Sequence, residues 1–349
     1  TWQEPDEKTL SFQREHSASL RISIVVPAYR TKKEHLEAML NSVSKQSYPH
    51  WELIVADAGG TAEFVQAWAK KNGICLREAA DASNLAEWKD QSIVLCTLSE
   101  NKGISANTNA GIELAAGDAV GLLDHDDLLT ANALWEMADC LEKEKKRGKQ
   151  KLVLFSDEDK CDGAASRFYE PNFKPDFDGE LLLTNNYICH FTVIETAFLK
   201  ELKLRSGFDG AQDYDLVLRA YAAGGQFVHV PKVLYHWRCH EASTASNPQS
   251  KRYAYEAGQR ALEDYCLRKG WKATVSGLKH LGFYREDYED SVFCQRPEIG
   301  IWAKPLPGGR DVFGIRHPKG FLVSGLYEND GSMRYAGLRK GYSGPMHRA

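Results

Sequence analysis

Short apolar runs that alternate with helical patterns constrain the fold of this chain more than any other feature. The apolar runs cover residues 22–26, 51–56, 73–77, 92–98 and 119–123, and amphipathic helices are predicted at 32–46, 61–71 and 104–116. A nearly continuous apolar run is typical of a strand that is buried on both faces of a parallel sheet. Because parallel strands need crossover helices, the alternation predicts a doubly wound, mostly parallel, Rossmann-like α/β sheet.

The length of the chain predicts more than one domain. A single core rarely grows beyond about 250–300 residues, and this chain has 349. We expect an N-terminal arm at 1–20, a regular α/β half at 21–150, a less regular half at 151–282 and a small β-rich appendage at 283–349. Since the chain begins with Thr1, we expect it to be a piece of a longer polypeptide.

Charge and composition exclude several classes of protein. The net charge of −4 leaves no basic surplus for general nucleic-acid binding. No apolar run approaches the roughly 20 residues that cross a bilayer, so no transmembrane segment is expected. The eight cysteines include no Cys-x-x-Cys pair, which argues against structural zinc and fits reduced thiols in the cytoplasm.

Polar motifs follow three of the predicted strands: Pro27–Arg30, Asp57–Gly59 and Asp124–Asp127. Ligands of open α/β sheets bind outside the carboxyl ends of the strands, so this edge is the expected site. The Asp124-x-Asp126 spacing could place one carboxylate on a Mg²⁺ or Mn²⁺ ion and the other on a ribose hydroxyl. The alternative is a solvated Asp-rich turn before the next helix.

Other candidates each have a structural alternative. Asp57 could bind a nucleobase or ribose, or simply form its turn. Gly103 and Asn107 lie at a helix start that could hold an anion or only be capped. Asp213 opens a helix and could accept a proton from an attacking hydroxyl, or complement the helix dipole. His236 could be a third metal ligand, although most isolated histidines are not ligands.

Taken in order, these motifs resemble a known family. They are Pro27-Ala28-Tyr29, Asp57-Ala58-Gly59, the stretch 101–111, Asp124-His125-Asp126-Asp127 and Gln212-Asp213-Tyr214-Asp215-Leu216. Together they resemble family 2 glycosyltransferases with the GT-A fold, chiefly bacterial enzymes that build surface polysaccharides. The similarity covers roughly residues 1–280.

The resemblance implies a role for each matching position. The nucleotide would be bound by Pro27, Ala28, Tyr29, Asp57, Gly103, Asn107, Asp124 and His125. Asp126 would bind Mn²⁺ or Mg²⁺ on the diphosphate, His236 sits where some relatives have a late metal- or phosphate-binding histidine, and Asp213 would be the catalytic base. Residues 21–150 would then be the donor half and residues 151–282 the acceptor and catalytic half.

The implied activity is metal-dependent, inverting transfer of a sugar from a nucleoside-diphosphate sugar to a glycan hydroxyl. UDP-hexose and dTDP-rhamnose are the expected donors, and a glycan or lipid-linked glycan is the expected acceptor. We expect a cytoplasmic protein whose membrane association, if any, is peripheral at the inner face. Ala58 replaces a second Asp of many relatives, Gln212 replaces a Glu, and the processive Gln-x-x-Arg-Trp signature is missing.

Two other functions stay open at this point. A sugar nucleotidyltransferase shares the sheet architecture but would have a Gly-rich, basic loop after its first strand, where this chain has Ala28–Thr31. A catalytically inactive glycan- or nucleotide-binding module needs no base, and the intact Asp126 and Asp213 argue against it. A metallophosphoesterase is disfavoured by the shortage of His and Asp at two-metal spacings.

Overall fold

The computed structural model describes residues 4–80, 88–239 and 252–288, and the backbone of five strands between residues 300 and 340. The chain divides into two compact units. The first consists of Thr1–Lys269 with Val275–Glu286, and the second of Gly270–Thr274 with Asp287–Ala349. The second unit contains a five-stranded antiparallel sheet of β13 (Gly300–Leu306), β14 (Arg310–Arg316), β15 (Phe321–Tyr327), β16 (Met333–Tyr335) and β17 (Arg339–Lys340).

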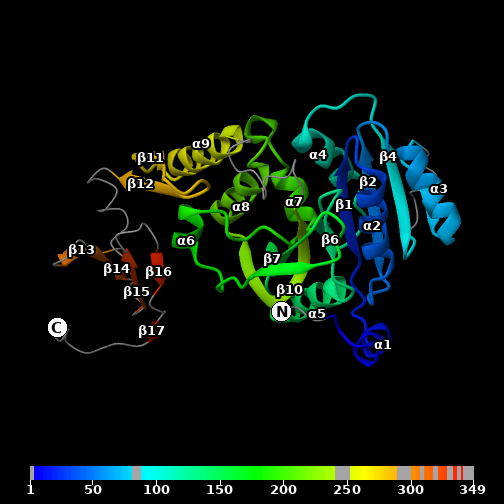
Figure 1. The fold of residues 1–349 in the computed structure, drawn as a ribbon, viewed down its shortest axis with the longest axis horizontal. Coiled ribbons are helices and arrows are strands. Elements are labelled where there is room, and N and C mark those ends of the chain that lie inside the picture. Colours follow the sequence, from blue (N-terminus) through cyan, green and yellow to red (C-terminus); the bar gives the residue numbers. More distant parts are fainter. Residues whose placement is uncertain are drawn as a thin grey trace. The chain divides into compact units, whose positions relative to one another are not determined.

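The first unit is built on one large sheet. Its strands are β1 (Ile22–Ala28), β2 (Trp51–Asp57), β3 (Cys75–Glu78), β4 (Ser92–Thr97), β5 (Ala119–Leu122), β6 (Leu128–Leu129), β7 (Leu152–Cys161), β8 (Phe168–Asn172), β9 (Thr192–Glu195) and β10 (Gln226–Arg238). The strand order is β3-β4-β2-β1-β5-β9-β7-β10-β6, with β8 paired to β7. Strands β1 to β5 pair in parallel, as do β7 and β10, whereas β9 is antiparallel to both of its neighbours. Figure 1 shows β1, β2 and β4 side by side.

Helices connect these strands. They are α1 (Glu7–Glu15), α2 (Lys33–Ser44), α3 (Ala62–Asn72), α4 (Ile104–Leu114), α5 (Ala133–Lys146), α6 (Gly179–Thr184), α7 (Thr196–Leu202), the short 3₁₀ helix η2 (Ser206–Phe208), α8 (Gln212–Ala222) and α9 (Arg252–Arg268). Strands β11 (Ala273–Gly277) and β12 (Tyr284–Tyr288) follow α9. The predicted doubly wound, mostly parallel sheet and the β-rich C-terminal part are both confirmed.

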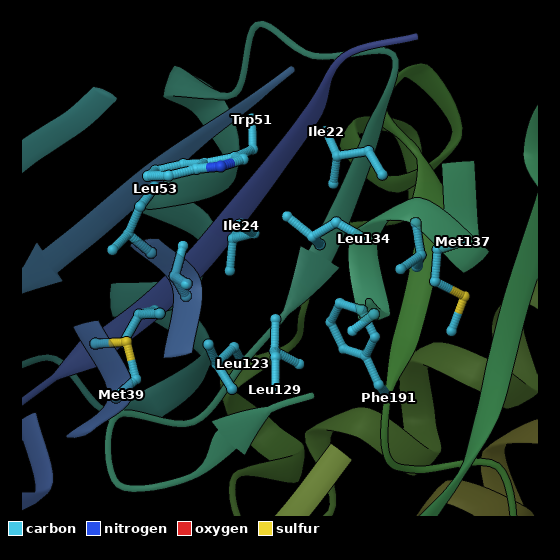
Figure 2. Close-up of a cluster of buried hydrophobic side chains, with 14 of the residues drawn as sticks. Ile22, Ile24, Met39, Trp51, Leu53, Leu123, Leu129, Leu134, Met137 and Phe191 are labelled. Atoms are coloured by element: carbon cyan, nitrogen blue, oxygen red, sulfur yellow. The ribbon is translucent and has the colours of Figure 1, made fainter. Parts of the chain in front are cut away.

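Both faces of the sheet are buried, which explains the unbroken apolar runs. Along β1, Ile22 and Ile24 join one core while Val25 joins the other, because successive side chains of a strand point to opposite faces. The first core is closed by α2, α3 and α5, and the second by α4, α7 and α8. Figure 2 shows the first core, where Met39 of α2 and Met137 of α5 flank the β1 side chains.

Candidate functional site

A cleft of about 980 Å³ opens in the first unit, at the ends of β1 and β5 and at the starts of α4, α8 and α9. Its lining carries more acidic than basic side chains: the acidic ones are Asp124, Asp126, Glu158, Asp209 and Asp213, and the basic ones are His125, His190 and Arg238. The structure therefore brings together the acidic turn after β5 and the first turn of α8, which lie about 90 residues apart in sequence.

The acidic turn 124–127 is fixed by the end of β10. Asp127 is buried and accepts hydrogen bonds from the Tyr235 hydroxyl at 2.5 Å and from the Arg238 amide at 2.7 Å. The Arg238 Nε atom donates to the Asp126 carbonyl oxygen at 2.5 Å. Asp127 is thus the structural member of the turn, and Asp124 and Asp126 line the cleft.

Crowded carboxylates in this turn resist ionisation. Burial, followed by the negative charges of Asp126 and Asp124, raises the pKa of Asp127 well above its usual range. Burial also raises the pKa of Asp124, together with the charge of Asp126 and against the attraction of His190. A cation would stabilise the ionised form of this turn, and carboxylate oxygens are the ligands that hard divalent cations prefer. Asp124 and Asp126 therefore suit Mg²⁺ or Mn²⁺.

The protein supplies only part of a coordination shell. Within residues 4–80, 88–239 and 252–288, no three His, Cys, Asp or Glu side chains are arranged to hold a metal ion. His125 places its Nδ1 atom 4.0 Å from Asp126 Oδ1. Mg²⁺ commonly binds through one or two carboxylates and takes its remaining ligands from substrate phosphates and water, so an incomplete protein set is compatible with such a cation.

His190 lies in the cleft and was missed by the sequence analysis. Its ring stacks on Tyr235 with centroids 4.8 Å apart, and its Nδ1 atom lies 3.4 Å from Glu158 Oε2. Burial alone would lower the pKa of His190, but the carboxylates of Glu158 and Asp124 outweigh it and raise the pKa to about 9. His190 is therefore a cation at neutral pH. The sequence contains no motif that predicts this role of His190, because Glu158 and Asp124 belong to segments that are distant in the chain.

Arg238 adds a second fixed cation. It is only 2% exposed, and its Nη1 atom donates to the Gly163 carbonyl oxygen at 2.7 Å. Its Nη2 atom is buried and has no hydrogen-bond partner among the residues that the structure describes. An arginine whose outer nitrogen lacks a partner beside a cleft is suited to an anionic ligand such as a phosphate.

The first turn of α8 carries two aspartates that have different surroundings. Asp213 lines the cleft, and its Oδ2 atom accepts a hydrogen bond from Asn186 Nδ2 at 3.0 Å. Asp215 is 1% exposed and forms ion pairs with Arg205 and Arg219. Asp215 thus holds α8 in place, whereas Asp213 is the aspartate of this turn that faces the cleft.

This division predicts a stability difference between two substitutions. Asp215→Ala should lower the free energy of unfolding by about 3 kcal/mol, because removing this buried carboxylate leaves Arg219 without its counter-charge and Arg205 with Asp264 alone. Asp213→Ala, in the same helical turn but facing the cleft, should cost much less. Urea unfolding followed by circular dichroism would compare them, and equal losses would contradict the assignment.

The residues predicted at the nucleotide end are placed as follows. Pro27 lines the cleft, while Ala28 is buried and its carbonyl oxygen accepts the Ala58 amide at 2.8 Å. Tyr29 is 39% exposed, with the Arg30 guanidinium 5.1 Å from its ring centre. Pro27 of β1 thus borders the cleft, and Ala28 and Tyr29 come directly after it in the chain. Ala28 pairs with Asp57 of β2.

Asp57 makes hydrogen bonds within its own turn, as expected if its role is to form that turn. It is 2% exposed, and its two oxygens accept hydrogen bonds from the Gly59 and Ala62 amides and from the Thr61 hydroxyl and amide. These bonds cap the start of α3. Recognition of a base by Asp57 stays a prediction.

The start of α4 is organised by its own side chains and by Asp209. Asn107 accepts from the Lys102 amide at 3.3 Å and donates to Asn101 Oδ1 at 2.8 Å. Gly103 has φ +94°, a conformation that favours glycine, and a Cβ there would lie 2.3 Å from Asp209 Oδ2. Gly103 and Asn107 therefore shape this border of the cleft, and nucleotide contact by them stays a prediction.

His236 is placed away from the cleft lining. It is buried in β10, its Nδ1 atom lies 2.5 Å from Asp159 Oδ1, and its ring packs against Phe168. This contact with a neighbouring strand is structural. Metal binding by His236 stays a prediction that would require this side chain to move.

Comparisons with known proteins identify the family of this chain. The sequence profile described as "Glycosyl transferase family 2" matches residues 23–202. The chain belongs to this family. The family match ends before Asp213 and Arg238, so it covers the acidic turn but not the whole cleft.

Sequence relatives of this chain include a bacterial O-antigen biosynthesis protein. The chain is 34% identical over 256 residues to the O-antigen biosynthesis protein RfbC of Myxococcus xanthus, covering 73% of this chain and 19% of RfbC. It is 36% identical over 255 residues to the protein y4gI of Sinorhizobium fredii, covering 72% of this chain and 26% of y4gI. The chain thus spans about a quarter or less of the length of these relatives.

A solved structure shares the GT-A fold. The structure of Staphylococcus aureus TarS 1–349 in complex with UDP-GlcNAc superposes with a TM-score of 0.52 at 19% identity, covering 71% of this chain and 67% of that one. The fold implied by the family resemblance is thereby confirmed. In the part of the chain that the structure describes, no helix is both long and apolar enough to cross a membrane.

Proposed function

We propose that this family 2 chain is a metal-dependent, inverting glycosyltransferase of bacterial surface-polysaccharide synthesis. It moves a sugar from a nucleoside-diphosphate sugar to a glycan hydroxyl. The observation that carries the proposal is that Asp213, the acidic turn and Arg238 line one cleft. The base of such a reaction and the charges that receive its leaving group must lie this close together.

In this proposal the chemistry is a single displacement. The acceptor hydroxyl gives its proton to Asp213, its oxygen forms the new bond to the anomeric carbon, and the bond from that carbon to the diphosphate breaks. Arg238 and the His190 cation stabilise the negative charge that develops on the diphosphate. Each of these groups is held by hydrogen bonds or stacking to residues of another segment, so little reorganisation is needed.

The donor would occupy the edge between β1 and the acidic turn. Mg²⁺ or Mn²⁺ would be held by Asp126 beside Asp124 and would supply positive charge to the diphosphate. The nucleoside would then lie toward Pro27, Ala28 and Tyr29, with Asp124 and His125 near the ribose. The relative TarS binds UDP-GlcNAc, which favours a UDP-sugar here, with a dTDP-sugar as the second candidate.

We also propose a role for each segment of the chain and a cellular location. Residues 21–150 would form the donor half and 151–282 the acceptor half, with 1–20 as an arm and 283–349 as an appendage that leads to a further domain. The acceptor would be a glycan or lipid-linked glycan, and we propose that the enzyme acts in the cytoplasm, at the inner face of the membrane. An inactive nucleotide-binding module is the main competing function.

Binding of nucleotides tests the proposal. UDP, dTDP, GDP and CMP would be added with and without Mn²⁺, and thermal unfolding followed. At 100 times its dissociation constant, the correct nucleotide should stabilise the protein by about 2.7 kcal/mol, and only when Mn²⁺ is present. No stabilisation of folded protein by any of the four would overturn the proposal, and binding without release of nucleotide from any donor would favour the inactive module.

A further inference from the structure

Asn186 makes a direct contact with the proposed catalytic base. It lies between α6 and β9, and its Nδ2 atom donates to Asp213 Oδ2 at 3.0 Å. A carboxylate only accepts hydrogen bonds, so this contact identifies the nitrogen end of the Asn186 amide. Oδ2 of Asp213 is thereby engaged, and the incoming hydroxyl is assigned to Oδ1.

The other end of the same amide has no protein partner. Asn186 Oδ1 is buried and lacks a hydrogen-bond partner among the described residues, and so does Oδ1 of its neighbour Asn185. Both residues line the cleft. Most buried side-chain oxygens in folded proteins accept at least one hydrogen bond, so an unpartnered acceptor beside a ligand cleft calls for a donor from the ligand.

The cleft that Asn186 lines also suits a sugar ring. Tyr253, at the start of α9, lines the same cleft and is 55% exposed, and Phe283 lies on the lining with it. Aromatic faces pack against the apolar faces of sugars while the hydroxyls at the ring edge reach polar groups. Cys189 borders both Asn186 and Asp213, and burial, followed by the charge of Asp213, raises the pKa of its thiol well above the usual range. Asp213 therefore has a neutral neighbour here rather than a competing base.

We propose that Asn186 is a positioning residue that orients Asp213 for attack and accepts a second hydroxyl of the acceptor sugar. This inference rests on the proposed function and names its acceptor class. The acceptor is a glycan whose reacting hydroxyl gives its proton to Asp213 Oδ1 while a nearby hydroxyl donates to Asn186 Oδ1. The Asn186 amide thus links the orientation of the Asp213 carboxylate to the presence of a correctly bound sugar.

Donor hydrolysis tests the positioning part without a known acceptor, since water then takes the place of the sugar. Asn186→Ala should lower kcat for hydrolysis of the accepted UDP- or dTDP-sugar by about 10- to 100-fold, as expected for loss of alignment. KM for the donor should change less than about twofold, because the donor lies against the other side of the cleft. Asn72→Ala, in an exposed position of α3, is the matched control and should behave as the wild type.

Two further variants separate positioning from general damage. Asn186→Asp keeps the size of the side chain but replaces the N–H donor with oxygen, so it should lose at least as much activity. Adding Asn186→Ala to Asp213→Asn should cost nothing more, because the residue acts through that base. A wild-type kcat in Asn186→Ala, or full additivity of the two substitutions, would overturn the positioning role.

The acceptor part is tested with p-nitrophenyl hexosides and their monodeoxy analogues. One deoxy analogue should be a poorer acceptor than its parent for the wild type, and Asn186→Ala should remove that difference. No discrimination by the wild type, or discrimination unchanged in the variant, would contradict the hydroxyl contact. If the wild type releases no nucleotide from any donor, the proposed function fails and this inference fails with it. Wild-type turnover with a fully active variant rejects the inference alone.

Discussion

Replacing Asp213 with Asn should lower turnover by about 10³-fold while leaving nucleotide affinity nearly unchanged. General-base assistance contributes roughly 10² to 10⁴ in rate, and an amide cannot accept the proton of the attacking hydroxyl. The side chain keeps its size at the start of α8, and the buried ion pairs of Asp215 still anchor the helix. Release of UDP or dTDP would report turnover, and calorimetric titration would report binding.

The control for Asp213→Asn is Asp139→Asn. Asp139 lies on α5, away from the cleft lining, and pairs with Lys143, so its substitution removes the same charge and should leave turnover unchanged. If Asp213→Asn retained more than about a tenth of wild-type turnover, Asp213 would not be the base. A weaker nucleotide affinity in the same variant would instead point to a disturbed cleft.

Replacing Asp126 with Ala should abolish the Mn²⁺-dependent part of nucleotide stabilisation and lower turnover by at least about 10²-fold. Charge stabilisation of this kind contributes several kcal/mol at a developing anion. Without the second carboxylate, the electrostatic crowding that raises the pKa of Asp124 and Asp127 also falls. Thermal unfolding with UDP or dTDP, at several Mn²⁺ concentrations, gives a readout that does not depend on activity.

A second variant shows whether this effect belongs to Asp126 or to the turn as a whole. Asp127→Ala removes the acceptor of the Tyr235 hydroxyl and the Arg238 amide, so it should destabilise the protein even without nucleotide. Asp126→Ala keeps both of these bonds, so it should lose less stability than Asp127→Ala when no nucleotide is present. Retention of Mn²⁺-dependent stabilisation by Asp126→Ala would contradict its assignment as a metal ligand.

The regular half of the fold was predictable because its signals are local. The run 22–26 and the run 51–56 became the parallel pair β1 and β2, since each is apolar enough to be covered on both faces. The acidic strand-end motif at 124–127 could be located for the same reason. It follows a strand directly, and chain order alone brings it to the carboxyl edge.

The second half was less predictable because distant partners decide it. Only residues 152–155 of β7 are a continuous apolar run, yet the strand continues through polar residues to Cys161. Its acidic residues can stay in a buried strand because Asp157 contacts His229, Glu158 contacts His190 and Asp159 contacts His236. These contacts cannot be read from the sequence, so the sequence analysis missed His190 and predicted His236 to be a metal ligand. Neither histidine can be interpreted without knowing which carboxylate faces it.

The anchoring of the acidic turn by β10 bears on the order of biosynthesis. Asp127 of the turn is held by Tyr235 and Arg238, which leave the ribosome more than 100 residues later. The segment 23–202 that matches the family profile therefore lacks the contacts that shape its own acidic turn. A fragment cut at residue 202 should have an ill-defined donor pocket, and nascent chains should acquire nucleotide affinity only after residue 238 has emerged.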